Sequence, residues 1–317
     1  MASSGSQTGN PPVMVVGVDR SGTTLLSLML DSHSRIAIPY ESKFFIRYHL
    51  EADRLGDLSR EADRRALVER MLAEPSVSRW RPALRPEEVD VSACSSLADC
   101  IDALMSAYAR AAGKEIWGDK TPAYIQGLHV LNAMFPEARF VHIIRDGRDV
   151  ALSLMRQWWG PNDFVNALRY WRERVACARK MLRMLPPGRF VELRYEDLIA
   201  EPERELRRVT DFLGLEFEPD MLTAYTRTAG EKVGDLIDEI HPGLRRAPDP
   251  AAACKWKRSL PPADQAIAHE IAGRLLAELG YPEGVKASRW KPLRELYHRL
   301  RAAYAWRFAD RPPPPSA

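Results

Sequence analysis

The chain has 317 residues, of which 45% are hydrophobic and 28% are charged, and its formal net charge is +3. This composition is typical of a globular protein. It argues against a disordered chain and against a strongly basic nucleic-acid-binding protein, so we expect no nucleic-acid partner. The length allows one large α/β domain or two small ones.

Neither the cysteines nor the N-terminus indicates a secreted protein or a metalloprotein. The four cysteines lack the spacing of a metal site and are too few and scattered for a disulfide scaffold, so we expect a reducing compartment. Residues 1–12 are small and polar, which predicts a flexible tail rather than a targeting peptide. Because no run of about 18 apolar residues is present to span a bilayer, we predict a soluble, cytoplasmic protein.

The first predicted elements are a strand, a glycine loop and a helix. Residues Val13–Gly17 are apolar and mostly β-branched, like a strand that is buried on both faces. After the loop Val18–Thr24, apolar residues recur with a helical period, namely Leu25, Leu26, Met29 and Leu30. The loop therefore connects the end of a strand to the start of a helix.

This loop has the frame of a phosphate-binding loop, because Gly17 and Gly22 match the glycines of G-x-x-x-x-G-K-[ST]. Backbone N–H groups of such a loop, and the dipole of the helix that follows, attract an anion. Thr23 stands in place of the lysine that binds nucleoside triphosphates, and no clear acidic strand end is available for Mg²⁺. The site therefore suits a ligand with fewer charges at the transferred group, with Arg20 and the loop hydroxyls as donors.

Residues 51–115 differ from the rest of the chain in composition. They are rich in Arg, Glu, Ala and Leu, which predicts several short amphipathic helices. This helical insertion either covers a substrate site or serves as a scaffold.

Further strands are predicted at Arg139–Ile144 and Arg189–Leu193. Helices are predicted at Glu203–Leu213 and around Ile267–Leu279, each ending at a glycine. Because strands alternate with helices, we expect an α/β fold with a mainly parallel sheet and right-handed crossovers. We place these elements in a single domain over residues 13–285.

The segment 286–317 is basic, and its residues 286–311 hold eight Lys or Arg and two acidic residues. Apolar residues after Pro292 fall on one helical face, which predicts a basic amphipathic helix. This helix either docks on its own domain or contacts a membrane surface or a partner. The final PPPPSA is expected to be disordered, and homodimerisation stays open.

A second motif follows the strand Arg139–Ile144. Arg145 leaves the C-terminal end of this strand, where open α/β sheets bind ligands, and its guanidinium can grip phosphate oxygens in a fork. Ser153 lies two helical turns further on and can point the same way. The alternative is an ion pair of Arg145 with Asp146 or Asp149.

Three segments resemble sulfotransferases that use 3′-phosphoadenosine 5′-phosphosulfate (PAPS). Arg20–Leu25 resembles the loop for the 5′-phosphosulfate, Phe140–Ser153 resembles the 3′-phosphate motif, and Arg194–Leu198 is similar to an Arg-Tyr-Glu-x-Leu segment. The three stand in the family's order over residues 13 to about 215. The resemblance implies a P-loop-like three-layer fold, PAPS as co-substrate without a metal, and sulfuryl transfer to a hydroxyl or amine.

The resemblance also assigns the nucleotide-binding residues, which are Arg20, Ser21, Gly22, Thr23, Thr24, Arg145, Ser153, Tyr195 and Lys255. Lys255 is the weakest match, because the serine that precedes this lysine in the family has no counterpart here. For Tyr195 the alternative is a packed aromatic side chain.

Glu41 is the candidate general base. The resemblance is to tyrosylprotein sulfotransferases and many bacterial relatives, in which a glutamate at this place removes the acceptor proton. The alternative for Glu41 is a surface or N-cap carboxylate, and His33, His49 and His142 are rival bases. Burial would raise the pKa of Glu41 and Arg20 would lower it, and the sequence leaves the balance open.

Lys120 is the second catalytic candidate. It lies in Trp117–Tyr124, which resembles the family's lysine-containing element, where the lysine stabilises the leaving phosphate, and Arg20 adds a second cation. The alternative is a solvated turn lysine.

An aromatic stretch beyond the second motif would line an acceptor pocket or stack on adenine, although its spacing favours a helix core: Trp158, Trp159, Tyr170 and Trp171.

Two other functions compete with sulfuryl transfer. One is a P-loop kinase-like nucleotide enzyme that has lost its lysine. The other is a non-catalytic nucleotide-binding protein that docks through its basic C-terminus. The acceptor is not readable from the sequence, because its choice depends on the variable helical insertion; a small molecule, a sugar, a lipid or a peptide would fit.

Overall fold

A computed structural model describes residues 9–234, 244, 249–250 and 253–285. The basic segment 286–317 and most of the N-terminal tail lie outside the described residues. Within the described part of the chain, no helix is long and apolar enough to cross a membrane.

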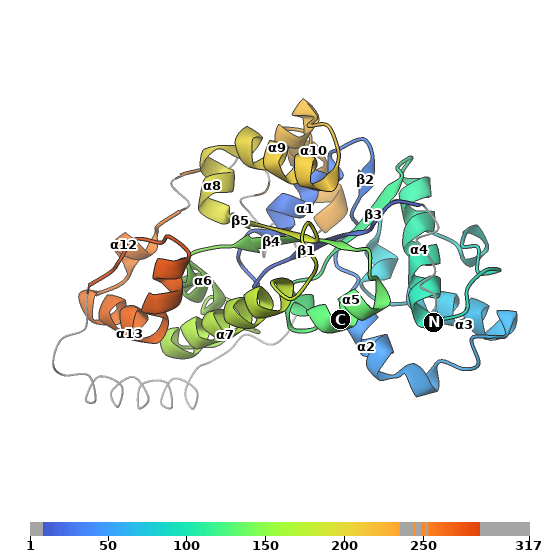
Figure 1. The fold of residues 1–317 in the computed structure, drawn as a ribbon, viewed down its shortest axis with the longest axis horizontal. Helices are drawn as coiled ribbons and strands as arrows, with labels where there is room; N and C mark the ends of the chain where they lie inside the picture. The colour runs from blue at the N-terminus through green and yellow to red at the C-terminus, as the bar shows by residue number, and fades with distance from the viewer. Residues whose placement is uncertain (1–8, 235–243, 245–248, 251–252, 286–317) are drawn as a thin grey trace.

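The centre of the fold is a five-stranded parallel sheet with the strand order β2-β3-β1-β4-β5 (Figure 1). Its strands are β1 (Val13–Val16), β2 (Ile36–Ala37), β3 (Ile116–Lys120), β4 (Arg139–Ile144) and β5 (Phe190–Arg194). Because all five run in one direction, the loops that leave their C-terminal ends gather at one edge, where such sheets bind ligands. The prediction of an α/β fold with a mainly parallel sheet is confirmed.

The sheet separates two hydrophobic cores, as its strand sequences require. Successive residues of a strand point to opposite faces, so Met14 and Val16 enter one core while Val13 and Val15 enter the other. A strand that is buried on both faces is usually apolar along its whole length, and β1 follows this pattern. The result is a three-layer domain with helices on both sides of the sheet.

Each face of the sheet is covered by a different set of helices (Figure 1). One face carries α1 (Thr23–Asp31), α8 (Tyr195–Ala200), α9 (Pro202–Leu213) and α10 (Tyr225–Val233). The other carries α5 (Leu128–Met134), α6 (Gly147–Leu154), α7 (Phe164–Leu182) and, beyond them, α12 (Trp256–Ser259) and α13 (Pro262–Glu278). Of the two helices predicted to end at a glycine, α9 does so, since Gly214 caps it in the left-handed conformation with φ 71°. The other, α13, ends at Glu278, two residues before Gly280, and Leu279 is its cap.

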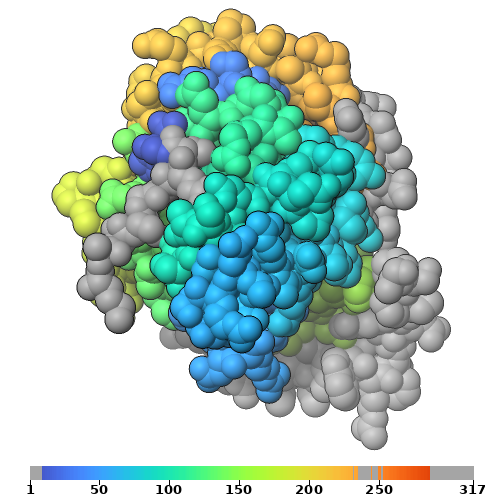
Figure 2. Space-filling model, turned by 90° about the vertical axis from the view of Figure 1, so that its right-hand side faces the viewer, coloured from blue at the N-terminus to red at the C-terminus, as the bar shows by residue number. Residues whose placement is uncertain are grey.

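The segment between β2 and β3 forms one end of the molecule. It holds α2 (Phe45–Leu50), α3 (Glu61–Leu72), α4 (Leu97–Ala111) and the 3-10 turns Ala52–Arg54, Val77–Arg79 and Pro86–Glu88. Figure 2 looks onto this end and shows the blue-to-green surface of this segment in the centre of the view. Two further 3-10 turns, Pro122–Gln126 and Pro219–Leu222, lie elsewhere in the chain.

One strand was missed in the sequence, and it matters for the site. The segment Ile116–Lys120 contains Gly118, Asp119 and Lys120, which do not look like an apolar strand, yet it forms β3 beside the central strand. In the register of the sheet, Val15 of β1 is paired with Lys120 on one side and Val141 on the other. Lys120 therefore ends a buried strand, and the solvated turn predicted as its alternative is wrong.

Candidate functional site

The phosphate-type loop follows β1 and packs tightly against its neighbours. Gly22 has φ 92°, and a Cβ atom added there would lie 2.4 Å from the Tyr195 ring. A Cβ atom at Gly17 would lie 2.6 Å from the carbonyl oxygen of Ile143. Both positions therefore require glycine. The loop leads directly into α1, whose first N–H groups face the same edge of the sheet.

The hydroxyl of Ser21 is a buried group that points to a ligand. Its Oγ is inaccessible to solvent and has no hydrogen-bond partner among the described residues. A buried hydroxyl without a partner costs about 1–3 kcal/mol. A bound anion in the loop would supply the missing acceptor.

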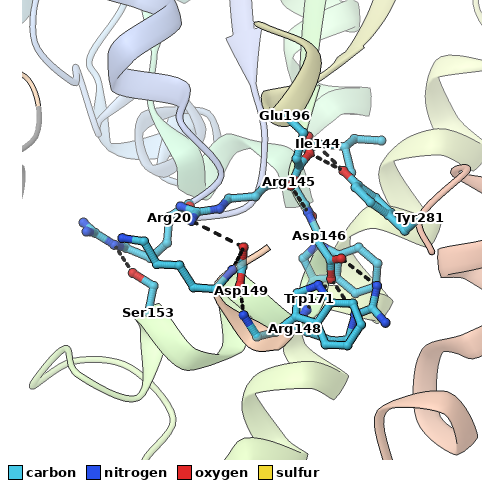
Figure 3. Close-up of polar contacts among 12 residues, drawn as sticks. Arg20, Ile144, Arg145, Asp146, Arg148, Asp149, Ser153, Trp171, Glu196 and Tyr281 are labelled. Carbon is cyan, nitrogen blue, oxygen red and sulfur yellow. Dashed lines mark hydrogen bonds and ion pairs between the residues drawn. The ribbon is translucent and has the colours of Figure 1, made fainter. Parts of the chain in front are cut away.

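Arg20 and Arg145 place two guanidinium groups at this loop (Figure 3). Arg20 Nε donates to Ser153 Oγ at 3.0 Å, which joins the loop to α6. Arg145 Nη1 donates to the Arg20 carbonyl oxygen at 3.3 Å, and its guanidinium lies 4.6 Å from the centre of the Tyr195 ring. The structure thus brings together both motifs that the sequence analysis singled out.

The two cations are held close at an electrostatic cost. Burial and the positive charge of Arg145 lower the pKa of Arg20, although Asp19 acts in the opposite direction. The predicted alternative for Arg145, an ion pair, is present in a weak form, since Arg145 Nη2 lies 3.8 Å from Asp149 Oδ2. An anion between Arg20 and Arg145 would relieve their repulsion.

Glu41 lies in the loop after β2 and faces two lysines. Its carboxylate is 2.8 Å from Lys120 Nζ and 3.2 Å from Lys43 Nζ. Burial raises the pKa of Glu41, but Lys120 and Lys43 outweigh it, so that its pKa falls below the usual 4.5. The sequence analysis predicted that Arg20 would lower the pKa of Glu41, whereas in the structure Lys120 and Lys43 lower it. The side chain is only 13% exposed, which rules out a surface carboxylate.

Lys120 connects the Glu41 loop to the phosphate-type loop. Besides Glu41 it donates to Thr24 Oγ1 at 3.2 Å, and its ammonium lies 4.5 Å from the centre of the Tyr40 ring. The side chain is 1% exposed. A buried ammonium therefore stands between a carboxylate and the candidate anion site.

Of the charged groups described above, Arg20, Glu41 and Lys43 line one cavity of about 470 Å³, a size suited to a small ligand. The lining does not include Lys120, Arg145 or Ser153. Its walls are formed by Asp19, Arg20, Thr23, Thr24, Tyr40, Glu41, Lys43, Thr121, Pro122, Ala123, Trp158 and Trp159. Because its lining combines hydroxyls and cations with aromatic rings, the cavity can hold an anion beside an apolar molecule.

The aromatic stretch divides between this cavity and the core. Trp158 and Trp159 lie in the turn between α6 and α7, 37% and 38% exposed, and line the cavity. The favoured prediction of a helix core is wrong for both, because α6 ends at Leu154 and the helical period is interrupted. The core prediction holds for Trp171, which is buried and donates to the Arg145 carbonyl oxygen at 3.1 Å. Tyr170 donates to Asp19 Oδ2 at 2.7 Å.

The remaining candidates fall near the site or away from it. The ring of Tyr195 packs on Gly22 and Arg145, so it is both a packed aromatic and a neighbour of the loop. The backbone N–H of Lys255 donates to Asp149 at 3.2 Å, close to Arg145. The rival histidines line no part of the described cavity: His33 contacts the Glu216 carbonyl oxygen, His49 is exposed on α2, and His142 contacts Glu192.

Asp119 is a functional candidate that the sequence analysis missed. Its buried carboxylate accepts hydrogen bonds from the Ser42 N–H at 3.3 Å and from the Thr121 hydroxyl at 3.4 Å. It thereby connects Ser42, which follows Glu41, with Thr121, which follows Lys120. Its position next to Lys120 was the only signal available. Burial raises the pKa of Asp119 to about 6.

We expect Asp119→Asn to change how stability depends on pH. With its pKa raised from 3.8 to about 6, Asp119 stabilises the fold in its protonated form, and this contribution is lost as the pH rises through that range. Asparagine stays neutral, so the variant should gain roughly 3 kcal/mol relative to wild type between about pH 4 and about pH 7. Thermal unfolding at both pH values measures the gain. A difference that is independent of pH would contradict the raised pKa.

Known proteins resemble this chain in sequence and in fold. The profile described as Sulfotransferase family matches residues 11–219. A nodulation protein, NoeE of Sinorhizobium fredii, is 26% identical over 322 residues, covering 90% of this chain and 71% of that protein. Protein-tyrosine sulfotransferase A of Caenorhabditis elegans is 23% identical, covering 86% and 67%. The sulfotransferase domain from the Synechococcus PCC 7002 olefin synthase superposes with a TM-score of 0.59 at 27% identity, covering 84% and 94%.

Proposed function

The chain belongs to the sulfotransferase family, and we propose that it transfers the sulfuryl group of PAPS to a hydroxyl or amine acceptor. The observation that carries this proposal is the junction of the two motifs, where Arg20 binds Ser153 and Arg145 contacts the Arg20 backbone. Two cations and a serine from different elements meet there at the end of the sheet. No cluster of three or more His, Cys, Asp or Glu within the described residues is arranged to hold a metal ion.

The residues at this junction fit PAPS by their chemistry. A bound anion would accept a hydrogen bond from the unpartnered hydroxyl of Ser21 and would reduce the repulsion between Arg20 and Arg145. Arg145 and Ser153 would hold the 3′-phosphate, with Tyr195 and Lys255 beside them, and the loop Arg20–Thr24 would hold the 5′-phosphosulfate. When bound, PAPS supplies the activated sulfuryl group.

Glu41 acts on the acceptor in this proposal. Its low pKa keeps it ionised at neutral pH, so its carboxylate is ready to accept the proton of an acceptor hydroxyl or amine. Lys43 and Lys120 hold the carboxylate in place through their ion pairs. The walls formed by Trp158 and Trp159 position the acceptor and exclude water.

Lys120 and Arg20 act on the leaving group. The transition state of such a transfer is in line and spreads charge over oxygen atoms, so fixed cations stabilise it most. Lys120 Nζ already reaches the phosphate-type loop at Thr24, and its burial strengthens its field. A small molecule, a sugar, a lipid or a peptide would serve as acceptor.

The test is calorimetric titration of 3′-phosphoadenosine 5′-phosphate (PAP) without metal, beside adenosine 5′-phosphate and Mg-ATP. We expect micromolar binding of PAP and a loss of about 30-fold or more in Arg145→Ala, because a charge-assisted hydrogen bond contributes roughly 1.5–3 kcal/mol. The exposed Arg65→Ala, which breaks only the ion pair with Glu61, serves as control. Absence of PAP binding, or a preference for Mg-ATP, would return the chain to the kinase-like alternative.

A further inference from the structure

Asp149 is a buried carboxylate beside the proposed nucleotide site, which it does not line directly. It stands four residues after Arg145, which precedes α6, and four before Ser153, so Asp149 and Ser153 lie on one side of α6. Figure 3 shows Asp149 between Ser153 on one side and Arg148 on the other. Its side chain is buried, and Oδ2 lies 3.8 Å from Arg145 Nη2.

The carboxylate of Asp149 also holds a distant part of the chain. Oδ1 accepts the N–H of Trp256 at 2.7 Å, and Oδ2 accepts the N–H of Lys255 at 3.2 Å. One side chain thus joins Arg145 to a segment that is more than a hundred residues away in sequence. The backbone of Lys255 is fixed next to Arg145 as a result.

Arg148 grips the same segment by a second route. Its buried guanidinium lies 3.5 Å from the centre of the Trp256 ring. It is held by Asp146 at 2.7 Å and by the Pro282 carbonyl oxygen at 2.9 Å. Two consecutive residues of α6 therefore fix Trp256, one by its ring and the other by its backbone.

The segment needs such support because its backbone is strained. Cys254, directly before Lys255, has φ 54°. A residue other than glycine in this conformation costs on the order of 1–2 kcal/mol and persists only where its surroundings impose it. The contacts of Asp149 and Arg148 are those surroundings.

We propose that Asp149 is a positioning residue for nucleotide binding, which acts through Lys255 and not through its own charge. By accepting the N–H groups of Lys255 and Trp256, it fixes the backbone from which the exposed Lys255 side chain extends, so that the ammonium would reach the 3′-phosphate that Arg145 holds. This inference rests on the proposed function and names a residue that the motif comparison did not assign.

Whether PAP binds more tightly or more weakly when Asp149 is replaced distinguishes a positioning role from a direct effect of its negative charge. A negative charge next to Arg145 weakens anion binding by itself, so removing it would tighten the binding of PAP. Removing a positioning contact has the opposite effect. In Asp149→Asn the amide offers its oxygen to one N–H group only and presents NH₂ to the other, which releases Lys255.

The experiment is calorimetric titration of PAP and of adenosine 5′-phosphate, which lacks the 3′-phosphate, on Asp149→Asn, Lys255→Ala and the double variant. We expect each single variant to weaken PAP about tenfold, with adenosine 5′-phosphate unchanged and the double variant no weaker than the single ones. Asp90→Asn, a carboxylate that also accepts a backbone N–H but lies at the surface, serves as control.

Three results would overturn the inference: tighter or unchanged PAP binding in Asp149→Asn, additive losses in the double variant, or an equal loss for adenosine 5′-phosphate. If Asp149→Asn does not fold, Asp149→Glu keeps the charge and displaces it by one methylene, and the same loss is expected. A wild-type chain that does not bind PAP would refute the proposed function and the inference with it, whereas normal PAP binding in Asp149→Asn refutes the inference alone.

Discussion

Glu41→Gln is expected to lower turnover about 1,000-fold or more while PAP affinity stays within about threefold of wild type. Glutamine has the shape of glutamate, but its single carbonyl oxygen can accept a hydrogen bond from only one of Lys43 and Lys120, and it cannot take a proton from the acceptor. Transfer of a labelled sulfuryl group from PAPS to an acceptor found by screening measures turnover, and calorimetry measures affinity.

The pH profile and a control variant sharpen this result. Because Lys120 and Lys43 hold the pKa of Glu41 below 4.5, its ionisation should not limit the wild-type rate between about pH 6 and about pH 8. Glu74→Gln removes a comparable carboxylate that pairs with Arg47 away from the cavity, and it should leave turnover near normal. Near-normal turnover in Glu41→Gln would show that Glu41 is not the general base.

Lys120→Ala is expected to lower the turnover number about 100-fold or more and PAP affinity much less, since removing one preorganised donor costs about that much. A second effect follows from burial. Burial alone raises the pKa of Glu41, and Lys120 is the main charge that opposes it, so the pKa of Glu41 should rise in this variant. The rate should then begin to fall at a higher pH on the acid side.

Lys43→Met provides the matched comparison, because Lys43 also contacts Glu41 and, unlike Lys120, is largely exposed. It should move the acid side of the pH profile in the same direction, with a smaller loss of turnover. If Lys120→Ala lost more affinity than turnover, Lys120 would be a binding residue only. An unchanged pH profile in Lys120→Ala would contradict its control of Glu41.

The sequence predicted those parts of the fold that depend on local pattern. The apolar run of β1 and the glycine at the end of α9 each carry their own signal. The β3 strand carries none, because Asp119 and Lys120 are buried there through contacts with Ser42 and Glu41 that lie far away in sequence. Propensity does not report such a tertiary contact.

The same distinction holds for the candidate site. Arg20 and Arg145 stood out because each follows a strand, and Glu41 stood out because its place resembles that of a glutamate in known sulfotransferases. Asp149 did not stand out, since its partner N–H groups belong to a segment that only the folded chain brings near. The tryptophans of the cavity were misjudged because spacing alone cannot tell where a helix ends. The candidate reacting groups could be predicted from residue type and position in the sequence. The groups that hold them in place, such as Asp149, could be identified only from the three-dimensional structure.

The burial of Arg148 against Trp256 has a consequence for the order in which the chain matures. Arg148 emerges from the ribosome long before Trp256, and until that residue arrives its guanidinium has no ring to cover it. Bringing Arg148 and Trp256 together closes a loop of about a hundred residues, and the entropic cost of this closure is offset only by contacts that form once Trp256 has been synthesised. The proposed nucleotide site is therefore incomplete until the chain has grown past Trp256, and a shorter chain would hold the phosphate-type loop without the contacts of Arg148 and Asp149 to that segment.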